Sequence, residues 1–235
     1  MVKWIFLVPL KSPAMFFFYE IAKKIGIDRI AEVANDFGLG NKFEISLKNQ
    51  KSGIIPTKKW KKSKIGESWY AGETLIAGIG QGFVLTNPLQ LAVMTSIIAA
   101  DGKNIKPTII KNMNIAFPEN NKYLEEIKIV KKAMFQVVNE NKGTAYSSRL
   151  DDIKFSGKTG TSQVRRISIS ERESEDFRKK EIEWKDRDHA LFVGYMPSSK
   201  PKYSISVVVE HGGSGASTAA PIAKDIFNYI YKLGL

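Results

Sequence analysis

The feature that most limits the fold is a pair of short runs near the C-terminus, residues 190–195 and 203–210, that are rich in Val, Ile, Phe and Tyr. These residue types favour strands. The connecting residues 196–202 include two prolines and two serines, which is typical of a turn. The pattern predicts an antiparallel hairpin. A third run, residues 155–163, is predicted to form a strand beside it.

Two helices are predicted around these strands. Residues 217–231 are expected to form a helix packed on the sheet, with Ile222, Ile226, Tyr229 and Ile230 at helical spacing and facing the strands. A mostly buried helix is expected after Pro88, with Thr86 as its N-cap. Together these elements indicate an α+β fold, an antiparallel sheet flanked by helices.

The predicted strand 155–163 is interrupted by Lys158, Thr159, Gly160 and Thr161. Side chains alternate along a strand, so Lys158 and Gly160 should face one way and the two threonines the other. A twist or bulge would be needed to bring both kinds to one pocket. Gly160 would let a ligand backbone approach closely, so we expect an edge strand with Lys158 in an open groove, next to residues 80–82 or residues 12–16. The alternative is a strand end with a solvated lysine.

The tetrapeptide resembles the third active-site motif of the penicillin-binding transpeptidases. The flanking segments resemble, in order, the penicillin-binding protein 2 group of peptidoglycan D,D-transpeptidases. The segments that carry this resemblance are residues 26–30, 37–40, 69–74, 79–82, 86–92, 100–103, 106–107, 141–145, 187–195, 210–213 and 219–223. The resemblance covers residues 16–235, which we interpret as the C-terminal portion of a transpeptidase domain. Residues 1–15 match nothing in the family and are interpreted as a leader.

The resemblance implies an incomplete β-lactamase-like domain and gives the tetrapeptide its roles. Lys158 and Thr161 would be catalytic, and Thr159, Gly160 and Thr161 would bind substrate. Lys158 would supply positive potential near the terminal carboxylate of the peptidoglycan stem peptide, and the threonine hydroxyls would bind that carboxylate. The Thr161 N–H would be one of two oxyanion-hole donors. β-Lactams would be ligands, and no cofactor is expected.

The nucleophile of the family is missing from the sequence. The only Ser-x-x-Lys spacing begins at Ser199, in the predicted turn, with Pro201 before Lys202. A serine nucleophile needs a fixed neighbouring base, which a turn containing proline does not supply. The family's second motif should fall at residues 13–15, but Ser12 is one position early and Met15 carries no amide or carboxylate. We therefore expect a truncated chain that is inactive alone.

Two alternatives remain open for the function of the chain. It could be a non-catalytic partner that completes the active site of a separately encoded N-terminal half. More remotely, it could be a basic protein that binds polyanions. An adjacent reading frame carrying Ser-x-x-Lys would favour the first of these.

The N-terminus gives no convincing export or membrane signal. Full-length family members are anchored in the inner membrane and act in the periplasm. Here the apolar stretch before Lys11 is far shorter than the about 20 residues that a spanning helix needs. It lies at the short edge of a signal-peptide core. The location of this chain is therefore left open.

Composition excludes several other classes of site. At 235 residues and 43% hydrophobic, the chain can bury a sizeable core. It has no cysteine and only two histidines, His189 and His211, so we predict no metal site. The net charge of +12 raises the question of nucleic acid, but only seven of the 36 basic residues are arginine, so no nucleic-acid partner is predicted. The lysine cluster at residues 58–62 could instead meet anionic headgroups or simply solvent.

The charged residues 165–188 are predicted to form a solvated excursion between two strands, with a helical stretch over residues 171–184. In the family a segment here flanks the active-site cleft. A surface loop with no role in substrate choice is an equal alternative.

Overall fold

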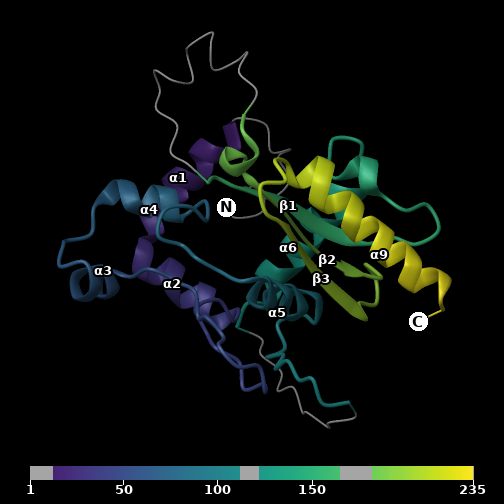
Figure 1. Cartoon of the computed structure of the whole chain (residues 1–235), viewed down its shortest axis with the longest axis horizontal. Coiled ribbons are helices and arrows are strands. Elements are labelled where there is room, and N and C mark those ends of the chain that lie inside the picture. Colours follow the sequence, from purple (N-terminus) through teal and green to yellow (C-terminus); the bar gives the residue numbers. More distant parts are fainter. Residues whose placement is uncertain (1–12, 112–121, 165–181, 235) are drawn as a thin grey trace.

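The computed structural model describes residues 13–111, 122–164 and 182–234 (Figure 1). Its described helices and strands are α1 (Pro13–Ile25), α2 (Ile27–Asp36), α3 (Lys58–Lys64), α4 (Ala71–Ala77), α5 (Pro88–Ala99), α6 (Leu124–Asn139), β1 (Ser156–Ser162), β2 (His189–Met196), β3 (Tyr203–Val209) and α9 (Ala220–Lys232). Two short 3₁₀ turns, η1 (Tyr146–Ser148) and η2 (Trp184–Asp186), and a π-helical turn, η3 (Gly215–Ala219), complete the list. The helix predicted over residues 171–184 lies almost entirely outside the described residues.

The three strands form one antiparallel sheet in the order β1-β2-β3. β2 and β3 form the predicted hairpin, with Met196 opposite Tyr203, and β1 pairs with β2, with Ser156 opposite Tyr195. The predicted strands and their adjacency are therefore confirmed. Because β2 is central, β1 and β3 each leave one edge unpaired among the described strands.

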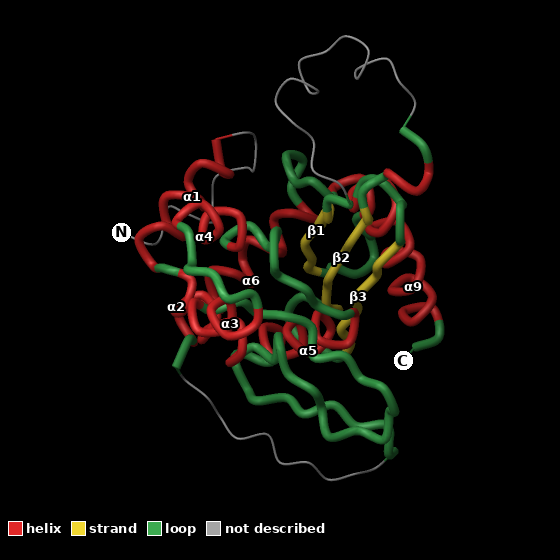
Figure 2. The backbone as a smooth tube through the Cα atoms, turned by 60° about the vertical axis from the view of Figure 1, so that its left-hand side comes forward, coloured by secondary structure: helices red, strands yellow, loops and turns green. Residues whose placement is uncertain are grey.

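Helices cover both faces of this sheet (Figures 1 and 2). α9 packs across β2 and β3 on one face, and α5 packs against the same two strands on the other. α6 lies against β1. The predicted α+β architecture, an antiparallel sheet flanked by helices, is confirmed.

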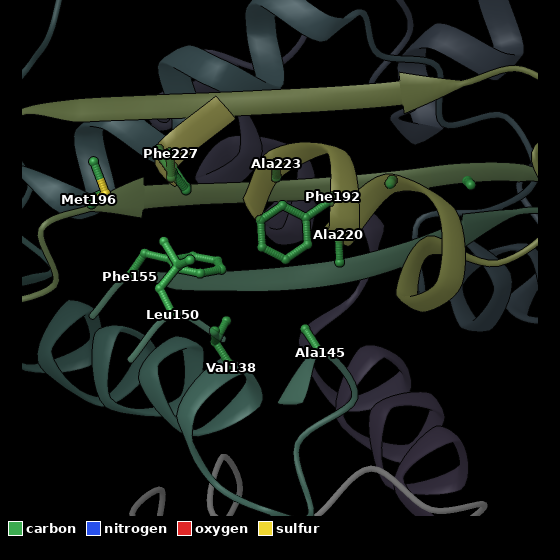
Figure 3. Packing of buried hydrophobic residues seen from close by; sticks show 11 residues of the cluster. Val138, Ala145, Leu150, Phe155, Phe192, Met196, Ala220, Ala223 and Phe227 are labelled. Atoms are coloured by element: carbon green, nitrogen blue, oxygen red, sulfur yellow. The ribbon is translucent and has the colours of Figure 1, made fainter. Parts of the chain in front are cut away.

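The main hydrophobic core lies between α9 and the sheet (Figure 3). Along β2, Ala190, Phe192 and Met196 point into it, as alternation along a strand requires. Phe155 stacks on both Phe192 and Phe227, with ring centroids 6.3 and 5.2 Å away. Tyr195 points to the other face, where it packs with residues of α5 and α6. β2 is therefore buried on both sides, which makes it the rigid centre of the fold.

The C-terminal helix forms as predicted, but most of its predicted contact face was wrong. Its buried residues are Ala220, Ala223 and Phe227, whereas Ile222, Ile226 and Tyr229 are 40%, 42% and 65% exposed. Only Ile230 of the predicted set packs against the core. The apolar arc of α9 is wider than the strip that the sheet covers, and small residues occupy the line of closest approach.

The helix after the Gly80–Gly82 region also forms, with a different cap from the one predicted. Asn87, not Thr86, is the N-cap, and its side chain accepts a hydrogen bond from the Gln90 N–H at 3.0 Å. In return, the Asn87 N–H donates to the side-chain oxygen Oε1 of Gln90 at 3.4 Å, which completes a capping box with Pro88 in the first turn. The side chain of Gln90 is fully buried and also donates to the carbonyls of Asn41 and Ser52.

Helices α1 to α4 lie together at one side of the sheet (Figures 1 and 2), and in Figure 2 β1 is the strand nearest to them. α1 contacts α4 and α2, and Ala22 of α1 lies so close to Gly78 that a side chain at residue 78 would collide with it. Lys61 of α3 is almost wholly buried and bridges to Glu73 of α4 at 2.5 Å. These contacts hold the segment after α4 in a fixed place next to the edge of β1.

Candidate active site

The Lys-Thr-Gly-Thr residues lie in the middle of β1, on an edge strand as predicted. Each residue from Ser156 to Ser162 has one partner on β2, so this stretch contains no bulge. Thr159 lies opposite Phe192 and therefore on the α9 face, whereas Lys158 lies opposite Val193 on the other face. The alternation was predicted correctly, and of the twist or bulge that was expected to bring both kinds of side chain to one pocket, no bulge is present in this stretch.

The length of the lysine side chain brings the two kinds of group together instead. Lys158 Nζ donates to the carbonyl oxygen of Thr159 at 2.6 Å and lies 3.5 Å from the Thr159 hydroxyl oxygen Oγ1. The side chain thus bends around the edge of the strand, so that its ammonium approaches the face that carries the threonine side chains. A single ligand group at this edge could contact both the Lys158 ammonium and the Thr159 hydroxyl.

The backbone of β1 presents its outward groups at Thr159 and Thr161. The Thr161 carbonyl accepts a hydrogen bond from Gln81 Nε2 at 3.3 Å, and Gln81 is not part of the sheet. In an antiparallel ladder the N–H and C=O of one residue point to the same side, and the side alternates along the strand. The N–H groups of Thr159 and Thr161 therefore point toward the unpaired edge, which is the direction expected for an oxyanion-hole donor at Thr161.

The ammonium of Lys158 is largely shielded from solvent. Burial lowers the pKa of its ammonium from the usual 10.5. Among the described residues no carboxylate forms an ion pair with it, and its ammonium contacts the two Thr159 oxygens instead. A desolvated cation with dipoles but no counter-charge favours the arrival of an anion, because the anion would offset the cost of desolvation.

Thr159 is held by a second threonine from a distant loop. The hydroxyl oxygens of Thr144 and Thr159 lie 2.9 Å apart. Thr144 follows the end of α6, where Gly143 sits so close to the carbonyl of Gln136 that an added Cβ would lie 2.6 Å from it. The sequence placed residues 141–145 in the resemblance but gave Thr144 no role. Its contact with Thr159 could not have been found without the fold.

Gly160 leaves little room for a side chain on the side of Leu191. A Cβ at residue 160 would lie 3.3 Å from the Leu191 Cβ, a tight contact, and would meet no other atom within 4 Å. The predicted use of this glycine, close approach of a ligand backbone, stays a prediction.

The loop of Gly80, Gln81 and Gly82 was predicted to neighbour Lys158, and it does reach the same strand, because Gln81 donates to the Thr161 carbonyl. The other predicted neighbour includes Ser12, which lies outside the described residues. That Lys158 lines an open groove stays a prediction.

The Ser-x-x-Lys spacing at Ser199 falls where it was expected, in the bends that connect β2 to β3. In this connection the Ser198 N–H donates to the Lys154 carbonyl at 2.8 Å, and the Lys202 N–H donates to the Met196 carbonyl at 3.0 Å. Ser199 and Lys202 therefore do not share a helix face, which is the arrangement that would let a lysine activate a serine.

Comparison with known proteins decides the family. A family model described as the penicillin-binding protein transpeptidase domain matches residues 10–228. The chain belongs to this family. Its sequence is 32% identical to the peptidoglycan D,D-transpeptidase MrdA of Haemophilus influenzae over 225 residues, a match that covers 91% of this chain and 34% of that protein.

Solved structures of transpeptidases in this family share the fold. The chain is similar to penicillin-binding protein 2 of Helicobacter pylori in its complex with MreC, with a TM-score of 0.81 and 32% identity over 93% of this chain and 38% of that one. It is also similar to penicillin-binding protein 2 of Pseudomonas aeruginosa bound to WCK 5153, with a TM-score of 0.74 and 34% identity over 90% and 44%. The resemblance to the penicillin-binding protein 2 group is thereby confirmed.

The transpeptidase match concerns only part of those proteins. The chain spans about a third of the length of the curated relatives that it matches. Within the described residues, no helix is both long enough and apolar enough to cross a membrane.

Proposed function

We propose that this chain supplies the substrate-binding strand of a peptidoglycan D,D-transpeptidase. The observation that carries the proposal is the desolvated ammonium of Lys158 at the outer edge of β1, beside the Thr159 hydroxyl and without an ion-pair partner among the described residues. The terminal carboxylate of a D-Ala-D-Ala stem peptide, or the carboxylate of a β-lactam, would bind there. Thr159 and Thr161 would hydrogen-bond it through their hydroxyls.

The outward backbone of β1 fits the remaining part of this role. An extended peptide beside an unpaired strand edge gains main-chain hydrogen bonds. Gly160 would keep this edge clear of side chains, and the Thr161 N–H would serve as one oxyanion donor. Such a site would act where peptidoglycan is exposed, so we place the functional compartment in the cell envelope.

Ligand binding can be tested directly on the chain, in an assay that requires no acylation or turnover. A diacetylated Lys-D-Ala-D-Ala tripeptide is titrated into isotopically labelled protein, and the amide resonances of Thr159 and Thr161 are followed. We expect saturable shifts that Lys158→Met abolishes. Lys200→Met, which removes an exposed lysine in the β2–β3 connection, serves as the matched control and should bind like the wild type. Equal binding by the Lys158 variant would rule out the proposed carboxylate contact.

We further propose that the chain alone forms no acyl-enzyme. Acylation needs an activated serine, and Ser199 has no positioned base. The purified chain is incubated with a fluorescent penicillin and run on a denaturing gel, where no labelled band is expected. A stoichiometric band that Ser12→Ala or Ser199→Ala removes would overturn this.

A second candidate function is that of a non-catalytic partner for a separately encoded N-terminal half. The observation that favours it is that the described residues form a core of their own around the sheet that carries the binding strand, so this strand could be presented to another chain. The same gel assay, with a fragment bearing Ser-x-x-Lys added, tests whether this chain completes the active site of that fragment. Label on that fragment only in the presence of this chain supports complementation, and no label in the mixture contradicts it.

A further inference from the structure

Gln81 occupies a place beside β1 that is fixed by its own backbone. The two residues that flank it, Gly80 and Gly82, have φ of 76° and 72°, in the region that glycine adopts without strain. The Gln81 N–H donates to the Ile76 carbonyl at 3.1 Å, and the Gly80 N–H donates to the Ala77 carbonyl at 2.9 Å. The loop is therefore folded back onto the end of α4 rather than extended into solvent.

The helix that carries this loop is itself anchored. Lys61 is 1% exposed and bridges to Glu73 at 2.5 Å, with its ammonium 4.3 Å from the centre of the Tyr70 ring. Trp69 Nε1 donates to the Thr74 hydroxyl at 2.8 Å. These contacts fix the first part of α4. Because the loop with residue 81 follows this helix, they also restrict where residue 81 can lie.

From this scaffold the Gln81 side chain reaches 80 residues along the sequence to donate to the Thr161 carbonyl at 3.3 Å. Thr161 is near the end of β1, and the described chain leaves the strand after Ser162. A strand end with an unpaired edge can twist away from its neighbour, and a donor from outside the sheet opposes that motion. The Thr159 carbonyl is held in a comparable way by Lys158 Nζ.

We propose that Gln81 is a positioning residue for the ligand-binding edge of β1. By taking up the outward carbonyl of Thr161, it leaves the outward N–H of the same residue as the group available to a ligand, and it fixes the direction in which that N–H points. The expected effect of Gln81 on ligand binding rests on the proposed function. The hydrogen bond between Gln81 and Thr161 does not depend on it. Glutamine suits the place because its amide donates without adding charge next to Lys158.

The contact is tested on the full chain by the carbonyl carbon resonance of Thr161. Gln81→Glu keeps the shape and removes the donor, and Gln81→Ala removes the side chain. Both should move the resonance upfield, as loss of a hydrogen bond to a carbonyl does. Gln136→Glu, which alters an amide on α6 that donates to Glu140, is the matched control and should leave it in place. An unchanged Thr161 resonance in both Gln81 variants overturns the proposal.

Binding of the diacetylated Lys-D-Ala-D-Ala tripeptide provides the second readout. We expect Kd to rise about 3- to 10-fold in Gln81→Ala, as for loss of one hydrogen bond, and by at least as much in Gln81→Glu, whose added negative charge also repels the ligand carboxylate, with no change in the Gln136→Glu control. Unaltered affinity together with a shifted resonance would also overturn the positioning role, because the bond would then be structural only. If the wild-type chain does not bind the tripeptide, the proposed function fails, while the resonance still decides whether Gln81 holds Thr161.

Discussion

Replacement of Gly215 by alanine tests how closely the turn η3 approaches the candidate site. Gly215 is buried, and a Cβ there would lie 2.9 Å from the backbone nitrogen of Gly160 and closer still to the carbonyl oxygens of Gly160 and Leu191. All three atoms belong to the backbone of the paired strands β1 and β2. None of them can rotate out of the way as a side chain could.

The size of the effect follows from this geometry. The closest of these contacts would be 2.3 Å, to the Gly160 carbonyl oxygen, and real Cβ atoms essentially never come within 3.0 Å of another heavy atom, so η3 would have to move away from β1 by about 0.7 Å or more. Overpacking of a well-packed core costs about 1–3 kcal/mol. Because rigid backbone lies on both strands, we expect about 2–3 kcal/mol. For a chain of this size 1 kcal/mol corresponds to about 2–4 °C, so Tm should fall by about 4–12 °C.

The measurement is thermal unfolding followed by far-UV circular dichroism. Gly72→Ala is the matched control, because Gly72 lies near the start of α4 and a Cβ there would meet no atom within 4 Å. Alanine is the better helix former by up to about 1 kcal/mol, so the control should be as stable as the wild type or slightly more so. If the two variants unfold at the same temperature, the close approach of η3 to Gly160 is refuted.

Three further predictions concern charge and burial. Lys158→Met should be more stable than the wild type at neutral pH, because burial lowers the pKa of the lysine; denaturant titrations should show the difference shrinking as pH rises toward 10.5. Burial opposes ionisation of Glu73, but its hydrogen bonds with Lys61 and the Tyr70 N–H outweigh this effect and lower its pKa from 4.5. Glu73→Gln should therefore be less stable than the wild type at pH above 4.5, and the difference in unfolding free energy should vanish as acid protonates the wild-type carboxyl. On α9, Phe227→Ala should cost about 3–5 kcal/mol and its neighbour Ile226→Ala well under that, and equal losses in chemical unfolding would contradict the observed orientation of the helix.

The sequence by itself determined the strands and their order along the hairpin. Residues 190–195 and 203–210 have a strand composition and a short connection, and both signals are local, so they can be recognised without the tertiary structure. The same holds for Lys158 to Thr161, whose alternation along β1 follows from strand geometry alone. The family, too, was readable from the order of short segments.

Only the tertiary structure decided which face of each element is used. Helical spacing in α9 marks an apolar arc, but the arc is wide, and the sheet selected the side with Ala220, Ala223 and Phe227 because small side chains allow close approach. The cap at Asn87 rather than Thr86 depended on one residue of register, which the side chain of Gln90 fixes through partners far away in sequence.

The contacts of the candidate site were likewise outside the reach of sequence. Thr144 meets Thr159 across 15 residues, and Gln81 meets Thr161 across 80. Such pairs form because α6 packs against β1 and the loop after α4 reaches β1 through Gln81, not because of any pattern near the residues themselves. The sequence could identify Lys158 as a site residue. The path of its side chain around the edge of β1 toward Thr159, however, depends on the burial of one face of the strand and on the free edge beside it, and both exist only once the sheet has formed.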